Sequence, residues 1–275
     1  MVIIAIGWFM SFVYDAPEIL VFAVFFSIFM NIFSYWYSDK IVIKVTGAKP
    51  VKREEHLELW RVVENLSITA GLPMPKLYII EDSVPNALAT GRDAEHSAVA
   101  VTTGLLGILD KNELEGVIAH ELSHIGNRDI LVMTVVVVLV GFISLISDIF
   151  LRSRLYGGGN KDNKAGGVLM IVGLVLMILS PIIATLIQLA VSRKREFLAD
   201  ASGALLTRYP EGLASALEKI SAHSAPMKKA NRATAHMYIH NPFGQRESLK
   251  GKFLNLFQTH PPTAERIKAL RGLEV

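Results

Sequence analysis

Three long stretches that are almost free of charge constrain the fold of this chain more than any other feature. They cover residues 19–37, 130–151 and 167–191, and Asp148 is the single charged residue inside them. Each stretch is long enough to cross the hydrocarbon core of a bilayer as a helix. Hydrophobic residues make up 51% of the 275 residues, which is high for a soluble domain. The sequence therefore predicts a multi-pass membrane protein rather than a soluble protein with buried core helices.

The segment before the second stretch carries an H-E-x-x-H pattern formed by His120, Glu121 and His124. Asp110, followed three residues later by Glu113, is typical of a capping box and predicts that a helix begins there. On a helix, side chains four apart share one face, so both imidazoles can bind one metal ion. Glu121 would then lie beside that ion as a general base. The alternative is a pair of core histidines, because the pattern alone also arises by chance.

A second motif follows the third apolar stretch, where Glu196 and Asp200 are four residues apart. Glu196 is the predicted third ligand, since two histidines, one glutamate and a water form a catalytic zinc set. Asp200 is predicted to accept the ring N–H of His120 and to fix its tautomer. The chain has no cysteine, so the predicted ligands of one Zn²⁺ ion are imidazoles and a carboxylate. By itself, this spacing is also typical of a solvated helix start.

The metal motifs divide the chain into three parts. Residues 1–37 are predicted to be an N-terminal transmembrane region, and we expect its first helix to begin before this sequence does. Residues 38–129 and 192–275 form one cytoplasmic domain. The transmembrane hairpin 130–191 is inserted between the two halves of the site.

The distribution of charge supports this topology at one place and opposes it at another. Lys40, Lys44, Lys49 and Lys52 follow the first apolar stretch, as the positive-inside rule expects on the cytoplasmic side. The loop 152–166 is also basic although it must lie across the membrane, and we retain the assignment because the metal ligands have to meet. The net charge is only +3 and no basic and aromatic interleaving is present, so no nucleic-acid partner is expected.

Together these segments resemble the HtpX-type membrane zinc metalloproteases, which are relatives of the CAAX prenyl endopeptidases. The motifs that carry the resemblance lie at residues 85–91, 101–106, 120–124, 192–200 and 259–262. The resemblance implies an α+β, mainly α, protein whose gluzincin-like zinc protease domain carries a small sheet. It also implies four transmembrane helices in the cell membrane, and the degradation of damaged or misfolded membrane proteins. This chain departs from the family at its start and at Leu88, where the family often has Phe.

Catalysis can be written as a hypothesis in which Glu121 takes a proton from a zinc-activated water. A polypeptide substrate would pair with the strand predicted at residues 98–103. The residues expected to hold its backbone there are Ala98, Val99, Ala100 and Val101. Asn86 would hold the substrate from the neighbouring loop. His260 is expected either to stabilise the oxyanion or to begin a helix, and Arg195 either to contact substrate or to pair with an acid.

Two rival hypotheses remain open. An intramembrane protease of the site-2 type also carries H-E-x-x-H, but its motif would lie inside an apolar stretch. Here the residues before the motif are strongly polar, which favours a zinc site at the membrane face. A membrane scaffold or transporter with a structural metal is the second rival, and a closed structural site would need a fourth protein ligand.

Overall fold

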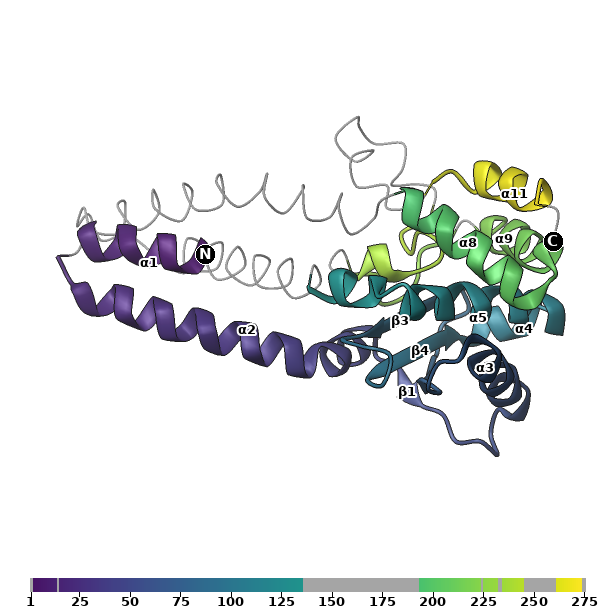
Figure 1. Ribbon diagram of the computed structural model, residues 1–275, viewed down its shortest axis with the longest axis horizontal. Helices are drawn as coiled ribbons and strands as arrows, with labels where there is room; N and C mark the ends of the chain where they lie inside the picture. Colours follow the sequence, from purple (N-terminus) through teal and green to yellow (C-terminus); the bar gives the residue numbers. More distant parts are fainter. Residues whose placement is uncertain are drawn as a thin grey trace.

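The computed structural model describes residues 2–13, 15–135, 193–223, 225–231, 234–244 and 261–273. At one end of the molecule, helix α1 (Val2–Val13) lies along helix α2 (Pro17–Thr46), and at the other end helices cover a small sheet (Figure 1). Among these residues, no helix combines the length and the apolar composition needed to cross a membrane. Residues 136–191, most of the predicted hairpin, lie outside the described part of the chain.

Helix α2 begins and ends at residues with the right backbone preferences. Pro17 stands at the first helical turn, where its missing N–H costs nothing. Gly47 ends the helix in a left-handed conformation with a φ of 69°. The helix runs straight through residue 37, where the sequence suggested that a transmembrane region ends. The polar residues that follow position 37 therefore extend the same helix instead of starting a new element.

The sheet has four strands in the order β1-β2-β4-β3. Their bounds are β1 (Lys49–Pro50), β2 (Lys76–Ile80), β3 (Ala87–Gly91) and β4 (Ser97–Thr102). Strand β4 runs parallel to β2 and antiparallel to β3, so that Ala100 lies between Tyr78 and Leu88. The predicted strand at residues 98–103 is thus present as β4, displaced by one residue. It is a central strand, and every residue in it is buried.

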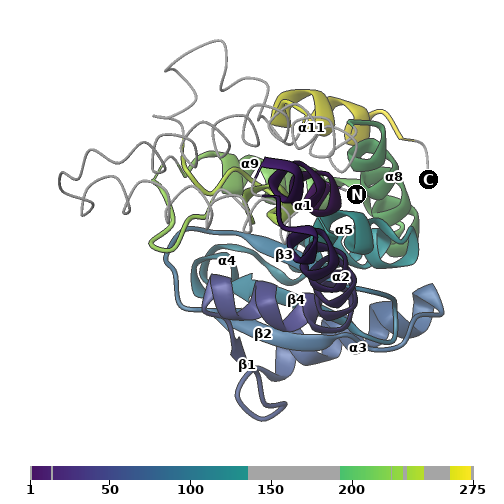
Figure 2. The ribbon, with the colours of Figure 1, turned by 90° about the vertical axis from the view of Figure 1, so that its left-hand side faces the viewer.

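Helix α5 (Lys111–Gly126) is the element on which the rest of the domain is assembled. It begins as predicted, because the Asp110 side chain accepts the N–H of Glu113 while Glu113 accepts the N–H of Asp110. It packs against α8 (Arg193–Thr207), α9 (Pro210–Ser221), α3 (Leu57–Ala70) and β3. Figure 2 shows it next to β3, on the side of the sheet away from β1. The other helices of the described residues are α4 (Thr103–Ile108), the 3₁₀ turn η1 (Ala235–Met237) and α11 (Thr263–Arg271).

Two glycines allow the helices around α5 to approach closely. A Cβ on Gly116 would lie 2.5 Å from the backbone nitrogen of Leu213 in α9. A Cβ on Gly203 in α8 would lie 3.0 Å from the backbone nitrogen of His120. Real Cβ atoms essentially never approach to 2.5 Å, and a contact of 3.0 Å is tighter than most, so a side chain at either position would force the neighbouring helix to shift relative to α5. The small residue in α8 therefore determines how near that helix comes to the histidines.

We predict that Gly116→Ala lowers the free energy of unfolding by about 1–3 kcal/mol, since the new methyl group meets rigid backbone and overpacks the helix contact. Gly126→Ala is the matched control in the same helix, because its Cβ would meet only the end of the Leu72 side chain at 3.7 Å. The control should be neutral or slightly stabilising, as Ala is the better helix former. Denaturant unfolding of both variants checks this, and equal losses would contradict the close contact.

Candidate metal centre

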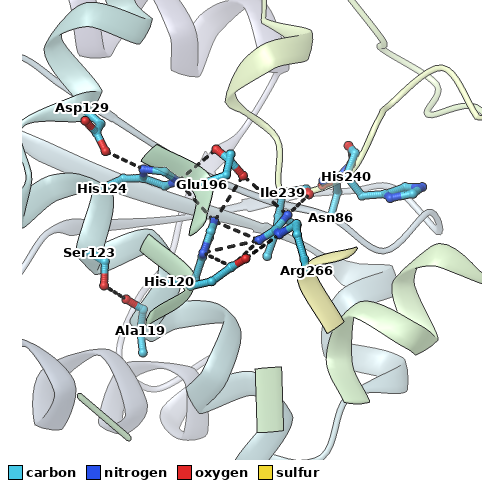
Figure 3. A network of polar contacts seen from close by, with 11 residues as sticks. Asn86, Ala119, His120, Ser123, His124, Asp129, Glu196, Ile239, His240 and Arg266 are labelled. Carbon is cyan, nitrogen blue, oxygen red and sulfur yellow. Dashed lines mark hydrogen bonds and ion pairs between the residues drawn. The ribbon is translucent and has the colours of Figure 1, made fainter. Parts of the chain in front are cut away.

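Three buried side chains from two helices converge on one point. His120 and His124 lie one turn apart on α5, and Glu196 reaches them from the first turn of α8 (Figure 3). Their donor atoms all lie within 4.8 Å of one another. The two Nε2 atoms are 3.2 Å apart, and the Glu196 carboxylate is 3.5 Å from His124 Nε2 and 4.0 Å from His120 Nε2. The structure thus brings together the three residues that the sequence predicted as ligands.

The second nitrogen of each imidazole is held by a carboxylate. His120 Nδ1 lies 2.9 Å from Asp200 Oδ1, and His124 Nδ1 lies 3.0 Å from Asp129 Oδ2. A carboxylate accepts the ring N–H, so each Nδ1 carries the proton and each Nε2 presents a lone pair. With these tautomers, two lone pairs and the Glu196 carboxylate face one another. This arrangement of acceptors fits a bound cation, and a divalent metal ion satisfies all three.

Asp129 is a partner that the sequence reasoning missed. It lies five residues after His124, just beyond the end of α5, and its second carboxylate oxygen accepts a bond of 3.3 Å from Arg195. Arg195 therefore pairs with an acid, which is one of the two roles expected for it. An aspartate closely following an H-E-x-x-H helix is the signal that could have identified this contact.

Arg266 is the second missed residue, and it lies at the centre of the network. It comes from α11 and is only 1% exposed. Its Nε and Nη2 atoms donate to both oxygens of Asp200 at 2.8 and 2.6 Å, and its Nη1 lies 3.5 Å from Glu196 Oε2. The same nitrogen donates to the carbonyl of Ile239 at 3.3 Å. One guanidinium therefore binds the C-terminal helix to the metal ligands and to the segment before it.

These contacts shift the pKa values of the buried groups. Burial alone would raise the pKa of Asp200, but Arg266 and His120 lower it to about 2. Burial, aided by the Arg266 charge, lowers the pKa of His120 to about 4. His120 is therefore neutral near pH 7 and Asp200 is ionised, which is the protonation state a metal-ligating imidazole requires. Burial would also lower the pKa of His124, but Asp129 and Glu196 hold it above its ordinary value.

Glu121 lies beside this group without joining it. Its side chain is 1% exposed, and the backbone N–H of Ala89 in β3 donates a hydrogen bond to its carboxylate. Burial, with the nearby Glu196 charge, raises the pKa of Glu121 to about 7. A carboxylate with a pKa near neutrality can both accept and return a proton at physiological pH. The geometry thus places a proton acceptor next to the candidate metal site.

The sheet topology excludes the expected pairing of a substrate with β4. Strand β4 is paired on both edges, by β2 and by β3, so Ala98, Val99, Ala100 and Val101 have no free edge for a substrate strand. That prediction is wrong because β4 is a central strand. The outer edge of the sheet on this side belongs to β3.

The side chain of Asn86 forms hydrogen bonds within the protein. Its side-chain amide donates to the carbonyl of His240 at 2.8 Å, and its carbonyl oxygen accepts the His240 N–H at 3.2 Å. Beside it, the Ile239 N–H donates to the carbonyl of Ala87 at 2.9 Å, and Tyr238 bridges Leu88. Ile239 and Tyr238 are buried, so this segment is a fixed part of the core at the edge of β3. In this structure Asn86 holds that segment in place, and it does not face an open substrate groove.

His260, the candidate for oxyanion stabilisation, lies outside the described residues, and its role stays a prediction. The structure describes the chain again from Pro261, immediately before α11.

A helix-borne pair of imidazoles, a glutamate from a second helix and a buried glutamate beside them define a metalloprotease type of site. A model of the family described as Peptidase family M48 matches residues 53–274. Because that match covers most of the sequence, this chain belongs to peptidase family M48.

Full-length relatives support the assignment. The chain is 45% identical over 281 residues to a protease HtpX homolog of Caldanaerobacter subterraneus subsp. tengcongensis, covering all of this chain and 92% of the relative. It is 51% identical over 250 residues to a protease HtpX homolog of Pyrococcus furiosus, covering 90% of this chain and 84% of the relative. The predicted resemblance to HtpX-type proteases is therefore confirmed.

The fold is also similar to that of a solved structure, the crystal structure of S. mikatae Ste24p. The TM-score is 0.55 at 20% sequence identity, and the match covers 97% of this chain. This chain spans 62% of the length of that one, and at this identity the likeness concerns the fold alone.

We predict that Arg266→Gln lowers the free energy of unfolding of the metal-free protein by about 3–5 kcal/mol, because it leaves the Asp200 carboxylate buried without its cation. Arg271→Gln in the same helix is the control, since its ion pairs with Glu211 and Glu218 are exposed and contribute little. Thermal unfolding in the presence of a chelator measures both. If the two variants melt alike, Arg266 does not hold this network together.

Proposed function

We propose that this metalloprotease is a zinc-dependent endopeptidase that cleaves polypeptides at a cell membrane. The observation that carries the proposal is the convergence of His120, His124 and Glu196 beside the buried carboxyl of Glu121. Imidazole and carboxylate donors favour zinc among the divalent metals of the cell. A set of three protein ligands leaves one position for water, which is the arrangement of catalytic rather than structural zinc sites.

We assign a separate chemical role to each residue of the site. His120, His124 and Glu196 would hold the zinc ion, with Asp200 and Asp129 fixing the two imidazoles through their Nδ1 atoms. Zinc, when bound, polarises a carbonyl and lowers the pKa of water. Glu121 takes a proton from the attacking water at its carboxylate and delivers it to the nitrogen of the departing amine. Its raised pKa suits both transfers.

The edge of β3 is the better candidate for binding the substrate backbone. The backbone N–H of Ala89 donates to the Glu121 carboxylate, so a polypeptide lying along this part of β3 would pass the proton acceptor. The edge at Ala87 is taken by Ile239, which limits the length of strand that a substrate can add. Recognition through backbone atoms would accept many sequences, as the turnover of damaged proteins requires.

Association with a membrane rests on the family and on the surface of α2. Aromatic residues on this helix, among them Phe22, Phe25 and Phe29, are more than half exposed. Together with the apolar stretches of the sequence, they support a multi-pass protein in the cell membrane with its protease domain, residues 38–129 and 192–275, on the cytoplasmic face. We include in the proposal a role in the quality control of membrane proteins, which follows from the resemblance.

Access to the site is the remaining requirement. His120, Glu121 and Glu196 are each 1% exposed, and His124 is 4% exposed. A polypeptide can therefore reach the site only when part of the surrounding structure moves aside. We predict that cleavage of a casein-type substrate is slow in the purified protein and is faster for unfolded than for folded substrates. The ratio of the two rates measures this, and equal rates would contradict backbone recognition by an enclosed site.

We predict that Glu121→Gln lowers cleavage by about 10²–10⁴-fold, because the amide cannot accept the proton of water. Its zinc content should stay near one ion per chain, since Glu121 is not among the ligands. Glu115→Gln is the control, because Glu115 lies on the same helix and pairs only with Lys111 at 3.7 Å. Proteolysis and metal analysis of both variants check this, and retained cleavage by Glu121→Gln would remove Glu121 from its role.

Removal of the metal tests whether the protein is an enzyme or a scaffold that is stabilised by its metal. Chelation should abolish cleavage and stoichiometric zinc should restore it, because the three ligands are already in place. A scaffold would lose thermal stability on chelation and show no zinc-dependent cleavage before or after.

A further inference from the structure

A groove of about 530 Å³ opens on the surface where α2 meets the sheet, away from the metal centre. One side of it is formed by the second half of α2, and the other by the start of β2 and the turn after β3. Figure 1 shows α2 projecting from the sheet at this point.

The two ends of the groove differ in chemistry. Toward the start of α2 its wall consists of Phe29, Ile32, Phe33 and Trp36, which remain exposed although they are large and apolar. An exposed apolar surface of this kind marks a binding site more often than an ordinary protein surface. Helix geometry puts roughly 10 Å between Phe29 and Trp36, and the charged end begins one turn further on, at Lys40. The apolar wall is therefore longer than a single side chain and can contact part of a lipid acyl chain.

The charged end collects three cations, Lys40, Lys76 and Arg92, against one acid of the lining, Asp39. The guanidinium of Arg92 lies 4.5 Å from the ring centre of Trp36, and the ammonium of Lys40 lies 5.1 Å from that of Tyr37. Aromatic rings hold cations in place without neutralising them. Even with Asp93, which pairs with Arg92, counted beside Asp39, the groove keeps a net positive charge at the end of an apolar wall.

Arg92 is the fixed point of this end. It donates from Nη1 to the carbonyl of Trp36 at 3.2 Å, and its Nε pairs with Asp93 at 3.3 Å. These contacts join the turn after β3 to α2 and orient the guanidinium toward the groove that it lines. The cation is therefore positioned by the fold, in contrast to the mobile charge of an exposed lysine.

We propose that this groove binds one anionic phospholipid, with the phosphate at Lys40, Lys76 and Arg92 and an acyl chain along Phe29, Ile32 and Phe33. A phosphate with an apolar tail matches both ends of the groove, whereas a free phosphate would leave the apolar wall exposed. The proposal rests on the membrane association proposed above, but it needs neither zinc nor proteolysis. Its ligand would fix the base of α2, and with it the protease domain, at the lipid surface.

The test uses Trp36 as a reporter in the full chain. Trp8→Phe and Trp60→Phe together leave Trp36 as the only tryptophan, and its fluorescence is measured in neutral detergent micelles. Brominated phosphatidylglycerol or brominated phosphatidylcholine is then added at equal mole fraction. We expect phosphatidylglycerol to quench Trp36 at lower mole fraction than phosphatidylcholine, and added salt to reduce the difference. If the double variant folds poorly, the quenching lost on Trp36→Phe in the otherwise unchanged chain gives the same quantity.

Charge variants test the site itself. Lys40→Gln and Lys76→Gln should each weaken binding of phosphatidylglycerol by about fivefold, as expected for one cation at a lipid surface. Lys44→Gln and Lys52→Gln are the controls, because both are exposed nearby lysines outside the groove. Equal quenching by the two lipids, or equal losses in groove and control variants, would overturn the proposal. Flotation with neutral vesicles tests membrane association separately, so a negative result here leaves the zinc endopeptidase proposal intact.

Discussion

The mutual approach of buried acceptor atoms on α5 and α8 is the constraint on which the rest of this structure depends. Two imidazole lone pairs and a carboxylate lie within a few ångströms of one another, out of contact with water. Such a group is unfavourable unless a cation lies among or beside it. The fold supplies one permanent cation, Arg266, and leaves room between the ligands for a divalent ion to supply the second.

This need for charge explains the arrangement of the surrounding elements. Gly203 lets α8 approach α5 closely enough for Glu196 to reach the histidines. Arg266 brings α11 onto Asp200 and, through the carbonyl of Ile239, fixes the segment that covers the edge of β3. Asn86 holds the same segment from the other side. The C-terminal part of the chain is therefore part of the metal site, although it contributes none of the three ligands.

Local periodicity and spacing predicted much of this, because both depend on neighbouring residues. The capping box at Asp110, the shared face of His120 and His124 and the shared face of Glu196 and Asp200 are all read from offsets of three or four positions. Strand order cannot be read in this way, which is why β4 was taken for an edge strand when β3 occupies that place. Arg266 and Asp200 are 66 positions apart, and Asn86 and His240, which are joined by hydrogen bonds, are 154 positions apart. No pattern in a single sequence predicts pairs at such separations.

The central claim is that His120, His124 and Glu196 bind a single metal ion with a position left for water. X-ray absorption of the zinc-loaded protein tests it most directly, because imidazole and carboxylate ligands give distinct scattering. We expect one zinc ion per chain with two imidazole nitrogens at about 2.0–2.1 Å and the remaining ligands oxygen. Alanine at Glu196 should leave the imidazole signal and reduce the zinc content. A spectrum without imidazole, or zinc content that does not change when His124 is replaced, would contradict the account.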